Sequence, residues 1–139
     1  MSRSLERARQ ELGAARMLVD AGFPTQAVAH ACAAGLHTAR AALAELGELP
    51  PAPVAIASAY GRLVVGDGGV THETGRALRR LLELRLIADE ALADVPPERA
   101  REAIEDSAAL LAATEAWLLS RPPDRRASVA HGAAGPRSG

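Results

Sequence analysis

Two charged residues interrupt the most strongly patterned stretch of the chain, residues 71–93. Arg85 and Asp89 are four residues apart, so on a helix their side chains lie one turn apart on the same face. Leu78 and Leu82 fall on the same line of that helix. An unpaired charge in such an apolar stripe would be costly to bury. We therefore expect Arg85 and Asp89 to pair with each other or with a partner; the pattern leaves open whether Arg85 faces a groove or is sealed in the core.

This pair has three possible roles. As a structural ion pair, it would fix the packing of the helix. As a binding site, Asp89 would orient the Arg85 guanidinium toward the phosphates of RNA or a nucleotide. As part of a dimer interface, the stripe would meet its own copy across a two-fold axis, a role compatible with either of the others.

Further arginines precede this pair in the same predicted helix. Arg76, Arg79 and Arg80 follow Arg62, and together they could form a basic edge that binds RNA or nucleotides; the alternative is an ordinary solvated face. Residues 66–69 are glycine-rich but have no lysine and no preceding strand, so they are not a phosphate-binding loop. No cofactor motif is present, and none is expected.

Two histidines, His30 and His37, share a face of the segment 25–46. Seven residues correspond to about 10.5 Å of helical rise, and no carboxylate stands three or four residues after either histidine. We therefore expect no metal site. One interpretation makes one histidine partly exposed and the other hydrogen-bonded inside the protein. The other places His37 in a polar cleft that faces the segment 71–93.

The spacing of apolar residues predicts an all-α fold. The predicted helices cover residues 4–21, 25–46, 54–65, 71–93 and 98–119. We expect an up-and-down antiparallel bundle of four long helices and one short helix. The second helix is rich in small residues, which lets neighbouring backbones approach, and so it is expected to be central. Residues 1–120 form this domain, and residues 121–139 are expected to be a disordered basic tail.

Composition limits the function classes. Residues are 48% hydrophobic but only 2% aromatic, which favours close-packed helices. Residues 1–120 hold 12 arginines and 16 acidic residues, a net charge of −4, which argues against broad, non-specific binding of nucleic acids. The single cysteine, Cys32, excludes an internal disulfide. With no apolar span and no signal-peptide core, we expect a soluble, cytoplasmic protein that does not enter a membrane.

A series of local matches gives the chain a family resemblance from Glu11 to about Trp117. The matches are Ala14-Ala15, Leu18, Gly22, Ala27-Val28, Ala34, His37, Ala39, Leu43, Ser58-Ala59-Tyr60-Gly61, Gly75-Arg76-Ala77-Leu78, Leu84-Arg85, Ala88-Asp89, Glu98 to Ala103 and Ala108. In these residues the chain resembles the HEPN family of small helical bacterial and archaeal proteins.

The resemblance implies a helical bundle that forms a homodimer through the helices that carry an arginine motif. Many HEPN proteins are toxins that cleave RNA in a cleft at that dimer interface. Others are encoded beside a minimal nucleotidyltransferase that acts as their antitoxin. The ribonuclease members have an arginine followed, after four to six residues, by a histidine on the same helix.

This sequence departs from that pattern after Arg85. The corresponding positions hold Glu90, alanine and leucine, and the next histidine is His131. We therefore expect a non-catalytic HEPN module that binds RNA or a partner protein through Arg85 and Asp89. The alternatives are a metal-independent endoribonuclease that uses Arg85 with His37 or Glu90 as substitute acid or base, and a purely structural helical oligomer.

Overall fold

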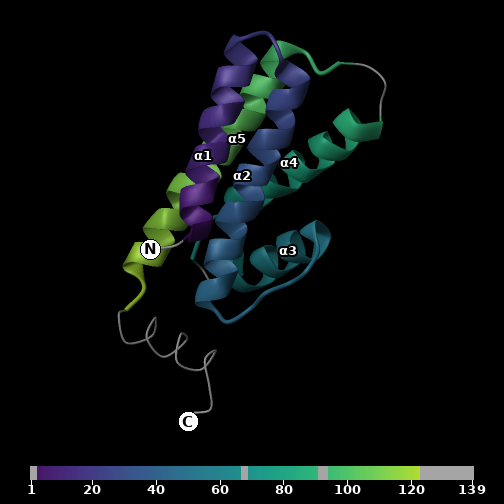
Figure 1. The fold of residues 1–139 in the computed structure, drawn as a ribbon. Helices are drawn as coiled ribbons and strands as arrows, with labels where there is room; N and C mark the ends of the chain where they lie inside the picture. The colour runs from purple at the N-terminus through teal and green to yellow at the C-terminus, as the bar shows by residue number, and fades with distance from the viewer. Residues whose placement is uncertain (1–2, 67–68, 91–93, 123–139) are drawn as a thin grey trace.

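The computed structural model describes residues 3–66, 69–90 and 94–122, which form an all-α bundle (Figure 1). The elements are α1 (Arg3–Asp20), α2 (Pro24–Glu45), α3 (Pro53–Ala59), the π-helix η1 (Tyr60–Val65), α4 (His72–Glu90) and α5 (Pro97–Ser120). The predicted helical bundle is confirmed, and the described helix ends lie within one residue of the predicted ones. The predicted end of the fourth helix, at residue 93, lies outside the described residues.

The apolar spacing of α1 determines which face it packs on α2. The buried residues of α1 are the five that repeat at three- and four-residue spacing, Leu5, Ala8, Leu12, Ala15 and Val19. After α1 and after α2 the chain turns at a glycine with positive φ, 93° at Gly22 and 76° at Gly47. Because side chains are disfavoured in this left-handed conformation, the two glycines end the helices where the sequence predicts.

Helix α2 occupies the centre of the bundle, as its small residues predict. It contacts α1, α3, α4, α5 and η1. At Gly35 the approach of its neighbours is closest: an added Cβ would lie 2.9 Å from Leu81 Cδ1 and 3.4 Å from Leu110 Cδ2. The missing side chain therefore lets α4 and α5 approach the backbone of α2 at the same level.

The segment predicted as one short helix is divided in the structure. It begins as α3 and continues as the π-helix η1, which holds more residues per turn. Tyr60, at the junction, is fully buried, and its hydroxyl lies 2.8 Å from Thr114 Oγ1 of α5. Burial raises the pKa of Tyr60 to about 12, although the hydrogen bond with Thr114 acts in the opposite direction. This contact joins the short helices to α5.

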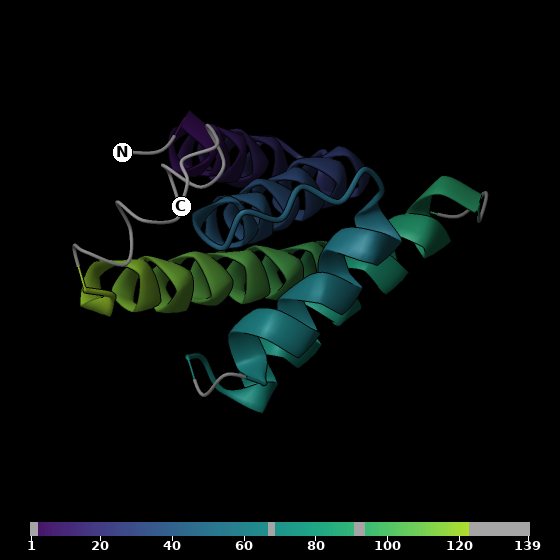
Figure 2. The same ribbon diagram turned by 90° about the horizontal axis from the view of Figure 1, so that it is seen from below.

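Helix α4 lies at an angle to the other long helices. Figure 2 shows α1, α2 and α5 side by side, with α4 and the α3–η1 segment crossing them obliquely. The helix begins after Thr71, whose hydroxyl accepts a hydrogen bond from the N–H of Thr74 at 3.2 Å and so caps the N-terminus of α4. Because α4 is inclined, only part of its length is covered by α2 and α5.

Arg121, a residue of the predicted tail, joins the C-terminal end of α5 to the end of α2. Its side chain is 8% exposed, and its Nε lies 3.3 Å from Glu45 Oε2 at the end of α2. The guanidinium also lies 4.9 Å from the centre of the Trp117 ring, a cation–π distance. The remainder of the predicted tail, residues 123–139, lies outside the described residues.

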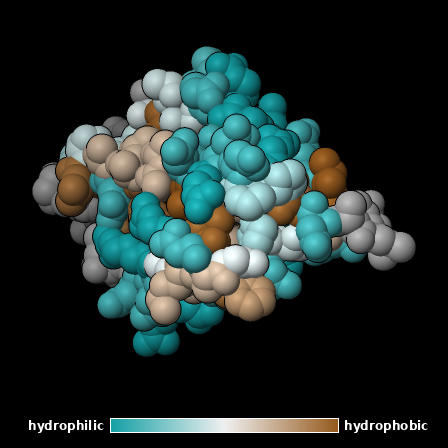
Figure 3. All heavy atoms as spheres, turned by 90° about the horizontal axis from the view of Figure 1, so that it is seen from above, coloured by the Kyte–Doolittle hydropathy of each residue, from teal (hydrophilic) through white to brown (hydrophobic). Residues whose placement is uncertain are grey.

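The prediction that the chain does not enter a membrane concerns the length and hydrophobicity of its helices and the character of its surface. No described helix is both long and apolar enough to cross a membrane. The face at the top of Figure 1 is mostly hydrophilic, and its hydrophobic residues form separate patches (Figure 3). This end of the bundle therefore offers no broad apolar surface.

Candidate functional site

A groove of about 330 Å³ lies between α2, the beginning of α3 and the C-terminal half of α4. Its lining residues are Cys32, Leu36, Ala52, Pro53, Val54, Leu82, Arg85, Leu86 and Asp89. Most of these side chains are apolar, and the two charged residues are the pair that the sequence singles out. An apolar groove with a few polar groups is the usual form of a binding site.

The structure pairs Arg85 with Asp89 but does not bury them. Arg85 Nε donates a hydrogen bond to Asp89 Oδ2 at 3.2 Å, so the predicted pairing is confirmed. The two side chains are 40% and 58% exposed, so Arg85 faces the groove and is not sealed in the core. The reason is the inclination of α4. Its apolar stripe is covered at Leu78 and Leu81 but becomes the wall of an open groove farther along.

Exposed apolar residues surround this groove. Leu86 of α4 and Val54 at the beginning of α3, two of its lining residues, are 56% and 76% exposed. Large apolar side chains at such exposure in one place are typical of a surface that contacts a partner. The Arg85 guanidinium therefore lies at the edge of an apolar surface, and among the described residues its ion pair is with Asp89.

Cys32 forms the buried part of the groove wall and is 1% exposed. Burial raises the pKa of its thiol, and the nearby Arg85 guanidinium partly offsets that rise by favouring the thiolate. The cysteine is therefore a neutral, packed residue at neutral pH. The sequence did not single out Cys32 and Leu36, because their four-residue spacing defines a face of α2 but not what that face meets.

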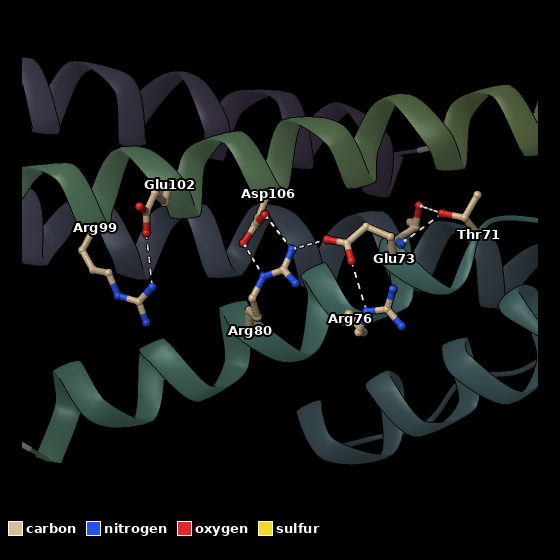
Figure 4. A network of polar contacts seen from close by, with 8 residues as sticks. Thr71, Glu73, Arg76, Arg80, Arg99, Glu102 and Asp106 are labelled. Carbon is tan, nitrogen blue, oxygen red and sulfur yellow. Dashed lines mark hydrogen bonds and ion pairs between the residues drawn. The ribbon is translucent and has the colours of Figure 1, made fainter.

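Two arginines of the predicted basic edge belong instead to an ion-pair network between α4 and α5 (Figure 4). Arg80 Nε lies 3.1 Å from Asp106 Oδ2, and its Nη2 lies 3.0 Å from Asp106 Oδ1. The same Nη2 lies 2.7 Å from Glu73 Oε2, while Arg76 Nε lies 3.1 Å from Glu73 Oε1. Two carboxylates therefore largely neutralise these two arginines.

The pKa values of this network agree with its geometry. The hydrogen bonds that Arg80 donates to Asp106 and Glu73 raise the pKa of Arg80. The hydrogen bonds from Arg80 and Arg76 lower the pKa of the Glu73 carboxyl. Each charge is thus stabilised by its partner. We interpret the network as a support that fixes α4 against α5.

The other two arginines of the predicted edge differ from this pair. Arg79 and Arg62 are exposed, and their side chains have no hydrogen bond or ion pair to any described residue. Arg79 lies against η1, since a Cβ built at Gly61 would be 3.4 Å from its Nη2. The four arginines therefore do not form one continuous basic surface.

The remaining predicted site residues do not gather around Arg85. His37 is five residues after Cys32, which corresponds to about 140° around α2, and it does not line the groove. Burial lowers its pKa, and Arg7 and Arg40 lower it further, so its charged neighbours belong to α1 and α2. Glu90 ends α4, and the position of its side chain is outside the described part of the structure.

The described residues contain no group of three or more histidine, cysteine, aspartate or glutamate side chains that could hold a metal ion. The site is therefore defined by its apolar wall and by one arginine–aspartate pair. Such a site can bind a phosphate or carboxylate through the guanidinium. It can also contact an apolar surface through the leucines beside it.

Comparisons with known proteins identify the class to which this helical bundle belongs. Residues 1–117 match the HEPN domain family. Because this match covers most of the 139 residues, the chain belongs to the HEPN domain family, as its resemblance predicts. A comparison with curated proteins finds no match.

Proposed function

We propose that this protein is a non-catalytic HEPN module of the cytoplasm that dimerises through the groove face and binds RNA through Arg85. The observation that carries this proposal is the position of the half-exposed Arg85 beside an open apolar groove. In a toxin–antitoxin, stress or defence system, the same surface would be recognised by a nucleotidyltransferase-type antitoxin. No metal ion or cofactor takes part.

The geometry of Arg85 supports contact with phosphate. A guanidinium has five N–H donors in a plane and binds phosphate oxygens in pairs. Within the described residues, its ion pair is with Asp89, through Nε. That contact orients the side chain, while exposure to solvent leaves it accessible to a ligand. Asp89 is therefore a positioning residue, and Arg85 is the binding residue.

The apolar residues beside Arg85 support dimerisation. Leu86 and Val54 would be covered if a second copy approached the groove across a two-fold axis. In such a dimer the two Arg85 side chains would lie near one interface, and the pair would present two guanidinium groups to one RNA strand. The apolar contact would stabilise the dimer, and the arginines would bind the ligand.

The missing acid–base residue favours binding over catalysis. After Arg85 no histidine follows on α4, and the next one in the sequence is His131. His37 lies on another side of α2, away from the groove lining. An arginine alone stabilises charge on phosphate but does not transfer the proton that cleavage requires. The endoribonuclease alternative therefore depends on Glu90 or on a residue from a second copy.

Incubation of purified protein with labelled cellular RNA in EDTA tests the absence of catalysis. We expect intact RNA with the wild type and with Arg85→Ala. In parallel, RNA binding should be measured by fluorescence anisotropy, with Arg79→Ala as a control for an exposed arginine of the same helix. Binding that is lost in Arg85→Ala and kept in Arg79→Ala supports the proposal. Cleavage that disappears in Arg85→Ala would instead establish a ribonuclease.

Sedimentation analysis tests the proposed dimer. Leu86→Glu places a charge on the groove face and should shift the protein toward monomer. Met17→Glu is the matched control, because Met17 is 74% exposed on α1, away from the groove. A wild-type monomer, or equal effects of the two variants, would contradict dimerisation through this face.

A further inference from the structure

Two adjoining hollows lie where the loop after α2 meets the α3–η1 segment. The loop between α2 and α3 crosses this end of the molecule (Figure 2). The hollows have volumes of about 320 and 340 Å³, and both are open to solvent. Glu48 and Arg62 line both of them, and no described residue lines both these hollows and the groove around Arg85. The two hollows therefore form a separate surface of the protein.

One hollow is formed where a face of α3–η1 carries small side chains. Ala55, Ser58, Ala59 and Arg62 are separated by three, one and three residues, a spacing that places them on one helical face. The first three are too small to fill the space between this face and the loop. The face therefore presents an open space that ends beside the Arg62 guanidinium.

Glu48 and Arg62 carry opposite charges and line the same space, but they do not pair. Both are exposed, and neither side chain has a hydrogen bond or ion pair to any described residue. The N–H of Glu48 donates a hydrogen bond to the Leu43 carbonyl at 2.8 Å, so the end of α2 fixes the backbone of this residue. A ligand can therefore bring a partner for each charge without breaking an ion pair.

Leucines border both hollows. Leu46 and Leu63 line one hollow, and Leu49, which is 80% exposed, lines the other. Covering such side chains is favourable. The described lining residues include no aromatic side chain that could stack a nucleobase, and Glu48 repels phosphate. These features favour a protein ligand over a nucleic acid.

We propose that the two hollows bind a peptide segment of a partner protein, in which leucine-like side chains lie between an acidic and a basic residue. The acidic residue accepts hydrogen bonds from the Arg62 guanidinium, and the basic residue donates to the Glu48 carboxylate. The apolar side chains enter the hollows. The surface needs neither Arg85 nor a second copy of the chain. It is thus independent of the proposed function, and each can fail without the other.

Titration of the full chain with a short fluorescein-labelled peptide, in which leucines lie between an aspartate and a lysine, tests the proposal. A second peptide has the two charges exchanged, because the direction of the bound segment is open. We expect saturable binding of at least one peptide by fluorescence anisotropy, with NMR amide shifts that gather at residues 46–50 and 55–63. No saturable binding of either peptide, or shifts confined to the Arg85 groove, would overturn the proposal.

Paired changes in protein and peptide then assign the two charges. Arg62→Gln should weaken binding of the aspartate peptide about threefold and leave its asparagine counterpart unchanged, because an exposed ion pair is lost only in the first case. Glu48→Gln should discriminate in the same way between a lysine and a glutamine in the peptide. Arg16→Gln, which changes an exposed arginine of α1, is the matched control and should bind as the wild type does. Equal effects on charged and neutral peptides would overturn the assignment.

A variant that fills one hollow should have the largest effect. Ser58 is exposed, so the fold should accept Ser58→Leu, and an unchanged melting curve by circular dichroism would show this. The new side chain occupies space that a leucine of the peptide would fill, and binding should weaken about tenfold. If Ser58→Leu binds the peptide as tightly as the wild type, the hollows are not its binding site.

Discussion

Two arginines of α4, five residues apart, have opposite surroundings. Arg80 faces α5 and meets two carboxylates, Glu73 and Asp106, through three short contacts. Arg85 lies where α4 leaves the bundle, and its one carboxylate in the described structure, Asp89, is itself more than half exposed. The same residue type on the same helix therefore acts as a support in one place and remains available to a ligand in the other.

What separates the two is the number of partners, and not burial. The side chains of Arg80 and Arg85 are 43% and 40% exposed, so exposure alone would not distinguish them. A guanidinium whose donors are used by carboxylates has lost much of its attraction for phosphate. Partner count is therefore the criterion by which we assign Arg85, and not Arg80, to binding.

The largest expected difference between them is in RNA binding. Arg85→Ala should weaken binding of a labelled RNA about tenfold, because a charged contact with phosphate is lost. Arg80→Ala should change the affinity by no more than about twofold, since its charge is already compensated. Fluorescence anisotropy at one fixed salt concentration measures both. Equal losses in the two variants would remove the distinction between support and binding site.

The free energy of unfolding should show the reverse order, with a larger loss in Arg80→Ala than in Arg85→Ala. Arg80→Ala should lower the free energy of unfolding by about 1 kcal/mol, a value kept small by solvent screening of this half-exposed network. For a domain of this size that is a decrease of about 4 °C in the melting temperature. Arg85→Ala should cost less than about 0.5 kcal/mol, as expected for an exposed pair within one helix. Thermal unfolding followed by circular dichroism would show whether the order is correct.

The pH dependence of stability should be traceable to Glu73. Its arginine partners lower the pKa of this carboxyl below the ordinary value of 4.5. The stabilisation is therefore present above pH 4.5 and is lost as the pH falls through the folded-state pKa. Glu73→Gln should make the free energy of unfolding less dependent on pH below 4.5. Near pH 7 its pH dependence should remain that of the wild type. Superimposable acid limbs would show that the Glu73 carboxylate does not stabilise the folded protein through these arginines.

The smallest effect is expected at Asp89. Asp89→Asn removes a pair between half-exposed side chains, worth about 0.3 to 0.5 kcal/mol on a helix. The same change relieves repulsion of phosphate, so RNA binding should stay equal or rise up to about twofold. Urea unfolding and anisotropy on the same preparation give both values. A large loss of binding would mean that Asp89 is required to orient Arg85 or contacts the ligand itself.

The helices could be predicted because each is defined by local chemistry. The apolar residues of α1 that repeat at three- and four-residue spacing form its buried face, and Gly22 and Gly47 lie where two of the predicted helices end. The pairing of Arg85 with Asp89 also follows from local spacing. The three-residue spacing of Glu73 and Arg76 is also typical of an ion pair within one helix. The run of arginines alone, however, suggests a basic edge.

The exposure of the site could not be predicted in the same way. It depends on the angle at which α4 crosses α2, which the contact at Gly35 permits and which no periodicity encodes. The partnership of Arg80 with Asp106 joins residues 26 positions apart, and the groove needs Val54 from a third segment. The sequence likewise could not predict that His37 faces the charges of α1 and not the groove, because this depends on how α1 packs against α2.

Trp117 gives this protein a built-in optical probe, because it is the only tryptophan in the chain. Its indole lies beneath Arg121, and the backbone of Gly69 passes so close to its Nε1 that a methyl group there would collide with the ring. Its emission therefore reports on the junction between α5 and the segment before α4. A ligand in the groove would leave the fluorescence nearly unchanged, whereas release of that junction would alter it at once.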